Sequence, residues 1–285
     1  MAADLPLYAY LNQEFLPLKS ATLHVSDLAI QRGYGVFDFI KVEGKQPLFL
    51  QNYLDRFYSS AGELNLKVPC TKQELKATIF DLVQKNDLGT SGLKMILTGG
   101  YSENGFDPVV PNLLIQQQSL TLPGKEMVEN GIKVITHEYV RELPEVKTIN
   151  YTMGIRLQKT VKEKGAADVL YHTNGAVSEF PRCNFFIVKQ DGTVATPSQN
   201  ILRGITRKNV LSLAARKFKA VEEEITLEDV LQAKEAFLTS TTKRVVPIVK
   251  VDEAVIGEGK PGEVTLSLLQ DLIEFEGSYI RDSNE

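Results

Sequence analysis

The sequence predicts an α+β protein built from two domains. Strand-like and helix-like patterns alternate along the 285 residues, and residues 119–130, which contain Pro and Gly, lose both patterns. Asn174-Gly175 and Asp191-Gly192 stand between apolar runs, as in tight hairpins, so antiparallel strands should be frequent in the second half. We expect a small α+β domain over residues 1–118, an interdomain linker over 119–130 and a larger domain over 131–285.

The first domain should mix strands with two helices. Apolar residues recur at helical spacing from Asn52 to Leu66, and Thr71 with Glu74 forms a capping box at the start of a second helix that ends near Asn86. Alternating apolar residues predict strands elsewhere. The expected strands are a short pair within residues 5–19, a hairpin formed by 36–42 and 47–50, and two further strands at 93–97 and 112–116.

The second domain should be richer in strands. A helix is expected from about Tyr151 to Lys164, where Gly165 would end it. The other expected elements are a strand at 132–135, hairpins around 174–175 and 191–192, helices at 207–218 and 227–233, a strand at 236–239, and a C-terminal helix from about Val264.

Composition excludes several classes of protein. The net charge is −4 without a basic stripe, which argues against a nucleic-acid partner, and the apolar runs are too short to span a bilayer. Three histidines and two distant cysteines, Cys70 and Cys183, argue against a metal site and fit a reducing cytoplasm. Residues 1–4 show no secretory pattern. We therefore expect a cytoplasmic protein without a bound metal.

Lys147 and Glu179 are candidates for chemistry. Lys147 stands among apolar residues just ahead of a helix, and burial would favour the neutral amine that attacks a carbonyl. The alternative is a surface lysine at a helix start. Glu179 ends a hairpin strand ahead of a very apolar one, so it should have a cationic partner. That partner is either Arg182 or a protonated pyridine nitrogen.

Two segments and one arginine could bind an anion. Residues 200–206 precede a helix, whose free N–H groups attract anions, and residues 239–242 supply hydroxyls after an apolar strand. Ordinary helix capping explains each segment equally well. Arg56 would pair either with a phosphate or with an acidic residue of the fold.

Taken together, these segments resemble the class IV aminotransferases, the fold-type IV pyridoxal-phosphate enzymes. The resemblance covers nearly the whole chain and implies a small N-terminal α/β sandwich and a larger antiparallel-rich pseudo-barrel. The motifs that carry it are Gly35-Val-Phe-Asp38, Tyr53-Leu-Asp-Arg56, Val146-Lys147-Thr-Ile-Asn-Tyr151, Ser178-Glu179 with Asn184-Phe-Phe, Gly204-Ile-Thr206, and Thr239-Ser-Thr241 with Pro247.

The resemblance implies roles for individual residues. Lys147 is similar to the catalytic lysine that holds the cofactor as a Schiff base and shuttles the proton, and Glu179 to the acid that keeps the pyridine nitrogen protonated. Tyr151 looks like the residue that hydrogen-bonds the ring hydroxyl, and Leu202 like the one packed on the ring face. The phosphate would be held by Arg56, the backbone of Ile205 and Thr206, and Thr241.

The sequence departs from the family at the substrate side. Many members have a Thr-Arg-Gly segment whose arginine holds the substrate carboxylate, whereas this chain reads Thr98-Gly99-Gly100. A desolvated carboxylate needs a cation, so another residue must replace it. Arg32, in a loop of the same subunit or of its neighbour, is the first candidate and Lys94 the second. The substrate-binding residues expected are Arg32, Phe37, Lys94 and Thr242.

The resemblance implies a transaminase. We expect transfer of an amino group between an amino acid, with D-amino acids first, and a keto acid such as 2-oxoglutarate, in a homodimer. The alternatives are a branched-chain L-amino-acid aminotransferase, an aminodeoxychorismate lyase, and a binding protein that kept the fold without activity. The last would predict loss of Lys147 or Glu179, and both are present.

Overall fold

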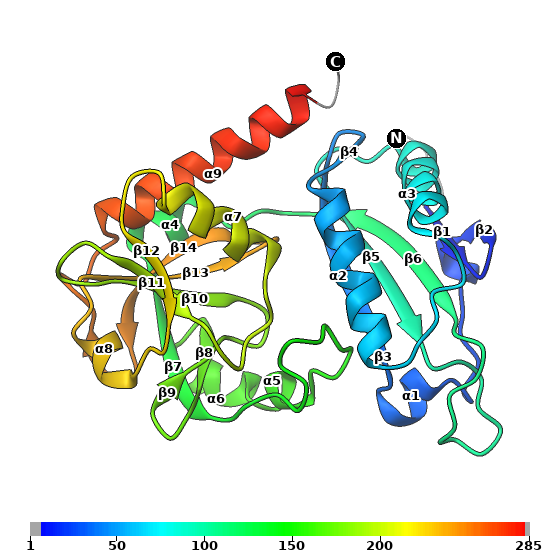
Figure 1. Ribbon diagram of the computed structural model, residues 1–285, viewed down its shortest axis with the longest axis horizontal. Coiled ribbons are helices and arrows are strands. Elements are labelled where there is room, and N and C mark those ends of the chain that lie inside the picture. The colour runs from blue at the N-terminus through cyan, green and yellow to red at the C-terminus, as the bar shows by residue number, and fades with distance from the viewer. Residues whose placement is uncertain (1–6, 283–285) are drawn as a thin grey trace. The chain divides into compact units, whose positions relative to one another are not determined.

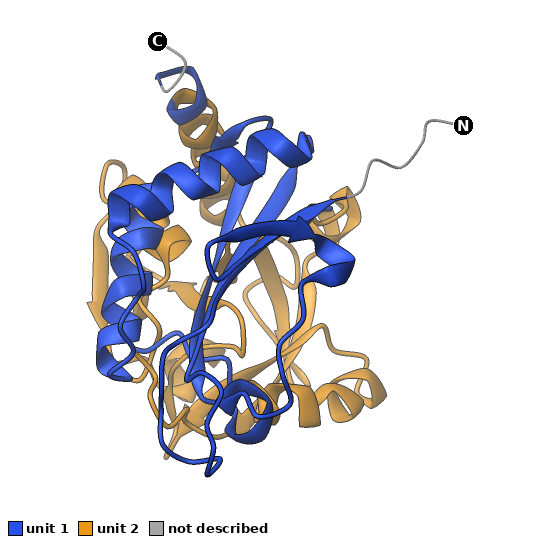
Figure 2. Cartoon of the chain, turned by 90° about the vertical axis from the view of Figure 1, so that its right-hand side faces the viewer, with its two compact units in different colours: residues 1–121, 146–150, 279–285 blue, residues 122–145, 151–278 orange. Residues whose placement is uncertain are grey.

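The computed structural model describes residues 7–282, which form two compact units (Figure 2). The first unit takes in the chain up to Thr121, the segment Val146–Asn150 and the chain from Tyr279 on, and the second unit takes in Leu122–Glu145 and Tyr151–Ser278. Residues 119–130, expected as an irregular linker, include the helix α4, Lys125–Asn130. The expectation of no secretory signal concerns residues 1–4, which lie outside the described residues.

The first unit is built on a six-stranded antiparallel sheet with the strand order β2-β1-β6-β5-β3-β4. Helices α2 and α3 cover one face (Figure 1). The longest pairing joins β3 to β5 from Gly35 opposite Thr98 to Val42 opposite Ser91. The elements are β1 (Tyr8–Leu11), β2 (Glu14–Pro17), the 3-10 helix η1 (Leu18–Ser20), α1 (Leu28–Arg32), β3 (Gly35–Glu43), β4 (Gln46–Pro47), α2 (Leu50–Glu63), α3 (Lys72–Asn86), β5 (Ser91–Thr98) and β6 (Leu113–Ser119).

The two faces of this sheet differ in burial, as alternating side chains predict. Val36, Ile40 and Met95 on the helix-covered face are fully buried. The opposite face carries side chains that are only half-buried, among them Phe37 and Lys94. The helix-covered face is therefore the hydrophobic core of the unit, and the other face is the one that presents functional groups.

The first unit confirms the predicted capping box. Thr71 Oγ1 accepts from the backbone N–H of Glu74, and the Glu74 carboxylate accepts from the backbone N–H of Thr71 at 2.7 Å. These reciprocal bonds satisfy donors that a helix start leaves without intrahelical partners. They fix the first turn of α3, which packs against β1 and β6.

The second unit is built on a nine-stranded mixed sheet. Its main path is β12-β11-β10-β13-β14-β7-β8-β9, and β15 pairs with β14. The pairs β11–β12, β14–β7 and β7–β8 are parallel and the others are antiparallel. The elements are β7 (Ile132–Glu138), α5 (Thr152–Arg156), α6 (Gln158–Glu163), β8 (Asp168–Thr173), β9 (Ala176–Val177), β10 (Asn184–Val188), β11 (Val194–Pro197), α7 (Ile205–Ala214), β12 (Ala220–Glu223), α8 (Leu227–Leu231), β13 (Glu235–Ser240), β14 (Arg244–Val251), β15 (Ala254–Val255) and α9 (Glu263–Asp282).

Helices α7 and α9 cover one face of this sheet (Figure 1). Phe186 and Phe237, on the neighbouring strands β10 and β13, stack at that face with their ring centroids 4.9 Å apart. Leu213 of α7 and Leu272 of α9 pack into the same cluster. Even α9, with 20 residues the longest described helix, does not combine the length and apolar character needed to cross a membrane, and neither does any other described helix.

The sequence predictions for the second unit are partly confirmed. Asn174 and Gly175, with φ values of 50° and 83°, form the turn of the hairpin β8–β9 as predicted. The helix predicted from Tyr151 to Lys164 is instead two short helices, α5 and α6, that meet at Leu157. Strands β12 and β14 were missed. Pro247 stands in the middle of β14, and proline inside a run argues against a strand when the sequence is taken alone.

An ion pair from α9 holds the turn between β13 and β14. Arg244, with φ 58°, begins β14, and its Nε and Nη2 donate to Glu276 Oε2 at 2.9 Å and 2.7 Å. Glu276 is 8% exposed, so its charge depends on this partner. The turn before Arg244 carries Thr241 and Thr242, two of the predicted site residues. The ion pair therefore stabilises part of the candidate site.

We expect Glu276→Gln to lower the free energy of unfolding by about 2 kcal/mol, because it leaves the Arg244 charge half-buried without its partner. Chemical denaturation at fixed protein concentration would measure this. The control is Glu274→Gln on the exposed side of the same helix, which should stay within about 0.5 kcal/mol of the wild type. Equal effects of the two substitutions would show that the pair adds no stability.

Candidate active site

The predicted site residues fall into two groups, one in each unit. The first unit holds Arg32, Phe37, Arg56, Lys94 and Lys147. The second unit holds Tyr151, Glu179, Leu202, Ile205, Thr206, Thr241 and Thr242.

Lys147 lies beside the first residues of β3. Its carbonyl accepts from the Phe37 backbone N–H at 2.9 Å, and its own N–H donates to Ser60 Oγ at 3.2 Å. The neighbouring Thr148 forms a bridge with Val36. The side chain is half-buried, and its Nζ lies 4.7 Å from the centre of the Phe37 ring. The backbone of Lys147 is thus fixed to the sheet while its amine lies against an aromatic ring.

Arg56 is held by a buried carboxylate. Its Nε donates to Asp38 Oδ2 at 2.9 Å and its Nη2 to Asp38 Oδ1 at 2.7 Å, which is a bidentate pair. The Asp38 side chain is fully buried in β3, and the Arg56 side chain is 12% exposed in α2. Arg56 also lies over the Tyr53 ring, 5.3 Å from its centre. The sequence left open a phosphate or an acidic residue as partner, and Asp38 is the acidic residue. The pair fixes the plane of the guanidinium but uses donors on only two of its three nitrogens.

Lys94 points to the same aromatic ring as Lys147. Its Nζ lies 4.9 Å from the centre of the Phe37 ring. Burial lowers the pKa of Lys94 from its ordinary value. Within residues 7–282, no carboxylate forms an ion pair with this amine. Phe37 therefore has two primary amines beside it, one of them a half-buried amine that could pair with an anion.

Arg32 and Gly99 occupy different surroundings. Arg32 is exposed at the end of α1, and its Nη1 donates to the Gln31 carbonyl at 2.9 Å. A side chain added at Gly99 would meet Leu28 and Tyr34, with a Cβ 2.8 Å and 2.9 Å from their nearest atoms. The place of the family arginine is therefore filled by this chain's own packing.

Glu179 is the centre of the second group. It is 4% exposed, and Arg141 Nε donates to its Oε1 at 3.0 Å. Its Oε2 accepts from the Leu202 N–H at 2.9 Å and from Asn184 Nδ2 at 3.4 Å. These donors stabilise the charged form of the carboxylate. Arg182, the partner considered from sequence, is exposed, and the cation beside Glu179 is Arg141.

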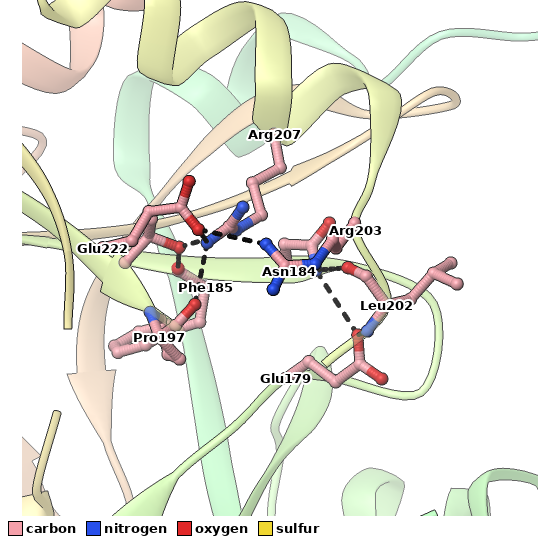
Figure 3. Close-up of polar contacts among 9 residues, drawn as sticks. Glu179, Asn184, Phe185, Pro197, Leu202, Arg203, Arg207 and Glu222 are labelled. Carbon is pink, nitrogen blue, oxygen red and sulfur yellow. Dashed lines mark hydrogen bonds and ion pairs between the residues drawn. The ribbon is translucent and has the colours of Figure 1, made fainter. Parts of the chain in front are cut away.

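Helix α7 begins at the loop that follows Leu202. Gly204 is its N-cap, no side chain caps the helix, and no acidic residue stands in its first turn. Ile205 and Thr206 supply the first helical N–H groups, so this N-terminus suits an anion. Arg207, 3% exposed, anchors the same turn by donating to Thr196 Oγ1, the Pro197 carbonyl and Glu222 (Figure 3).

The remaining predicted residues lie at element ends. Tyr151 is half-buried and is the N-cap residue of α5. Thr241 and Thr242 are half-buried in the turn between β13 and β14, where Ser240 Oγ accepts from the Lys243 N–H at 3.1 Å. Element ends present backbone donors and hydroxyls that regular structure does not consume.

Three residues of this arrangement were not predicted as site residues, namely Asp38, Arg141 and Asn184. Asp38 had a usable signal, since it alternates with the apolar Val36 and Ile40 and so had to be buried with a cation. Arg141 had a weaker one, because it precedes Lys147 by six residues in an irregular segment. The role of Asn184 depends on a contact with a loop 18 residues further along the chain, which no local pattern encodes.

The residues present fit pyridoxal phosphate. Lys147 supplies a primary amine beside an aromatic side chain, and Glu179 supplies a buried carboxylate whose charge is stabilised. Gly204 leaves the start of α7 without a side-chain cap, where a phosphate could take the donors. Amine, acid and anion site are the three protein groups that this cofactor requires.

Comparison with known proteins gives the family. Residues 35–251 match the model of the amino-transferase class IV family. The chain is 33% identical over 273 residues to a putative branched-chain-amino-acid aminotransferase of Methanocaldococcus jannaschii, covering 91% of this chain and 93% of that protein. It is 29% identical over 273 residues to a D-alanine aminotransferase of Listeria monocytogenes, covering 92% and 94%.

Solved structures show the same fold. The branched-chain amino acid aminotransferase of T.th., crystallised with pyridoxamine 5'-phosphate, matches with a TM-score of 0.89 at 25% identity over 96% of this chain and 95% of that chain. A putative 4-amino-4-deoxychorismate lyase of Legionella pneumophila shares the fold with a TM-score of 0.82 at 23% identity, covering 91% and 97%. The chain therefore belongs to the class IV aminotransferases, enzymes of fold type IV that use pyridoxal phosphate.

Proposed function

We propose that this aminotransferase moves amino groups between D-amino acids and a keto acid such as 2-oxoglutarate. The observation that carries the proposal is the half-buried amine of Lys94 beside Phe37, in a chain that has Gly99 where many relatives have an arginine. It makes the substrate side cationic by a different route, and a cationic pocket suits acidic or dicarboxylate substrates. The similarity to a D-alanine aminotransferase supports the choice of D-amino acids.

Branched-chain L-amino acids are the second candidate. The relative with 33% identity carries that name, although as a putative one, and Phe37, Phe39 and Ile96 give the open face of the first sheet an apolar character. The two candidates differ in stereochemistry, so one screen separates them.

Each residue has a proposed role. Lys147 bonds the cofactor covalently and, once released, moves a proton at the substrate α-carbon with its Nζ. Glu179 keeps the pyridine nitrogen protonated, Tyr151 hydrogen-bonds the ring hydroxyl and Leu202 packs on the ring. The phosphate is held by Arg56, Ile205, Thr206 and Thr241. Bound pyridoxal phosphate supplies the carbonyl that accepts the amino group and a ring that takes up the electrons of the α-carbon.

The wider organisation is part of the same proposal. The chain forms a small domain over residues 1–118 and a large one over 131–285, joined by 119–130, and it acts as a cytoplasmic homodimer. The exposed position of Arg32 supports a contribution to the second subunit rather than to its own, because its described contacts include no carboxylate. Phe37, Lys94 and Thr242 would contact the substrate within their own subunit.

The screen measures single half-reactions. The purified yellow enzyme is mixed with individual D- and L-amino acids, and loss of the cofactor's visible absorbance is followed. We expect D-amino acids to react at least about tenfold faster than their L-forms, which corresponds to about 1.4 kcal/mol between the transition states. Preference for L-leucine or L-valine would assign the branched-chain activity. Release of pyruvate from aminodeoxychorismate without either half-reaction would assign the lyase.

The attachment point of the cofactor is a separate prediction. Borohydride reduction followed by peptide mapping should find the cofactor on Lys147, because its backbone is fixed to the sheet and its amine lies at Phe37. Lys94 is the built-in control, since its amine lies at the same ring. A label on Lys94 would exchange the roles of the two lysines, and no label on either would reject the site.

The carboxylate partner can be tested by substitution and pH. We expect Lys94→Ala to raise KM for the amino acid at least about tenfold with little change in cofactor affinity. The lowered pKa of Lys94 means that its charge is lost at a lower pH than for an ordinary lysine, so KM of the wild type should rise as the solution becomes alkaline. An arginine keeps its charge over this range.

Arg32→Ala is the comparison. If Arg32 binds the carboxylate instead, its loss raises KM, Lys94→Ala is silent, and KM stays flat at alkaline pH. A contribution across a dimer has a further signature. Mixed dimers of Arg32→Ala and Lys147→Ala subunits would then recover activity that neither variant has alone. Sedimentation that found an active monomer would exclude both the dimer and this arrangement.

A further inference from the structure

We propose that Asn184 is a positioning residue that couples Glu179 to the N-terminus of α7, so that one side chain sets the geometry at both the acid and the anion site. The inference rests on the proposed cofactor roles of Glu179, Ile205 and Thr206. It goes beyond them because Asn184 contacts the protein groups of both sites and no cofactor atom needs to touch it.

The geometry is a closed triangle of three residues. Asn184 Nδ2 donates to the Leu202 carbonyl at 2.7 Å and to Glu179 Oε2 at 3.4 Å, and the Leu202 N–H donates to the same Oε2 at 2.9 Å (Figure 3). Asn184 is 6% exposed at the start of β10. Glu179 also forms a β-bridge with Asn184. The carboxylate and the Leu202 backbone therefore cannot shift independently.

The triangle continues into α7. The Gly204 N–H donates to the Leu202 carbonyl at 2.8 Å, and the Gly204 carbonyl accepts from the Lys208 N–H at 2.9 Å in the first turn of the helix. The Leu202 carbonyl thus accepts both from Asn184 and from the N-cap residue. A shift of Asn184 would change the direction of the first N–H groups of α7 as well as the position of the Glu179 carboxylate.

Gly204 is packed directly against Asn184. A Cβ on Gly204 would lie 2.0 Å from Asn184 Oδ1, much closer than real atoms approach. The φ of Gly204 is −62°, so an alanine is allowed by the backbone and excluded only by this contact. Gly204→Ala is therefore a substitution that displaces Asn184 without removing its amide.

A second anchor of α7 provides the contrast. Arg207 fixes the same turn from the other side through Thr196, Pro197 and Glu222, and none of its described contacts is with Glu179. Loss of that anchor should disturb the helix start without disturbing the acid. The coupling is thus a property of Asn184 and not of every residue that holds α7.

Two readouts separate the two ends of the cofactor. The ratio of pyridoxal phosphate affinity to pyridoxal affinity, measured by reconstituting the apoenzyme, reports the phosphate site. The pH midpoint of the cofactor's visible absorbance reports the acid. We expect Asn184→Ala to lower the ratio about tenfold, as for other residues that orient a binding group, and also to shift the midpoint. Arg207→Met should lower the ratio only, and Glu179→Gln should shift the midpoint only.

The double substitution is the sharpest arm. Gly204→Ala alone should reproduce both changes, whereas Gly204→Ala added to Asn184→Ala should have no further effect, because the clashing amide is gone. Additive effects of the two substitutions would overturn the inference. So would an Asn184→Ala protein whose thermal midpoint falls while both readouts stay at wild-type values. Should Asn184→Ala fail to fold, Gly204→Ala and Asn184→Ser carry the same two readouts.

Failure of the proposed site gives a different result. If Arg56→Gln leaves the affinity ratio unchanged and Glu179→Gln leaves the midpoint unchanged, the cofactor roles are wrong and the coupling falls with them. If those two variants respond as expected and neither Asn184→Ala nor Gly204→Ala does, the cofactor roles stand and the coupling is wrong.

Discussion

The buried charge of Glu179 is the constraint on which the second unit's share of the site depends. A carboxylate 4% exposed is tolerated only with a cation and hydrogen-bond donors around it, since desolvation would otherwise favour the neutral acid. Arg141 supplies the cation, and the Leu202 N–H and Asn184 supply donors. Because Leu202 belongs to the loop that leads into α7, the solvation of one carboxylate also fixes the start of a helix. Stability and function therefore use the same bonds.

The first unit solves a similar problem on its sheet. Asp38 is fully buried on the helix-covered face of β3, and Arg56 from α2 neutralises it with a bidentate pair. On the opposite face of the same strand, Phe37 carries the amines of Lys94 and Lys147. Successive residues of one strand thus orient an arginine on one side and two lysines on the other, as alternation along a strand requires. The net chemistry is a set of cations held by rigid elements, which suits a cofactor phosphate and substrate carboxylates.

Much of this could be predicted from the sequence, and the remainder has physical reasons. Local patterns correctly placed the capping box at Thr71, the Asn174-Gly175 hairpin and most strands, because each depends on neighbours within a few residues. The family and its cofactor followed from ordered motifs and are confirmed by the comparisons. Strand β14 was missed because Pro247 hides it, and the helix after Tyr151 breaks at Leu157 without a Gly or Pro to announce it. Arg141 could not replace Arg182 as the partner of Glu179 on sequence grounds, because the pair spans 38 residues.

The central claim is that Glu179 acts as a charged carboxylate and keeps the pyridine nitrogen of the bound cofactor protonated. The most direct measurement is the ¹⁵N chemical shift of ring-labelled pyridoxal phosphate in the intact enzyme near neutral pH. The account predicts the shift of a protonated pyridine nitrogen, because the acid beside it is stabilised in its charged form by Arg141 and Leu202. The shift of an unprotonated nitrogen in the wild-type enzyme would contradict it.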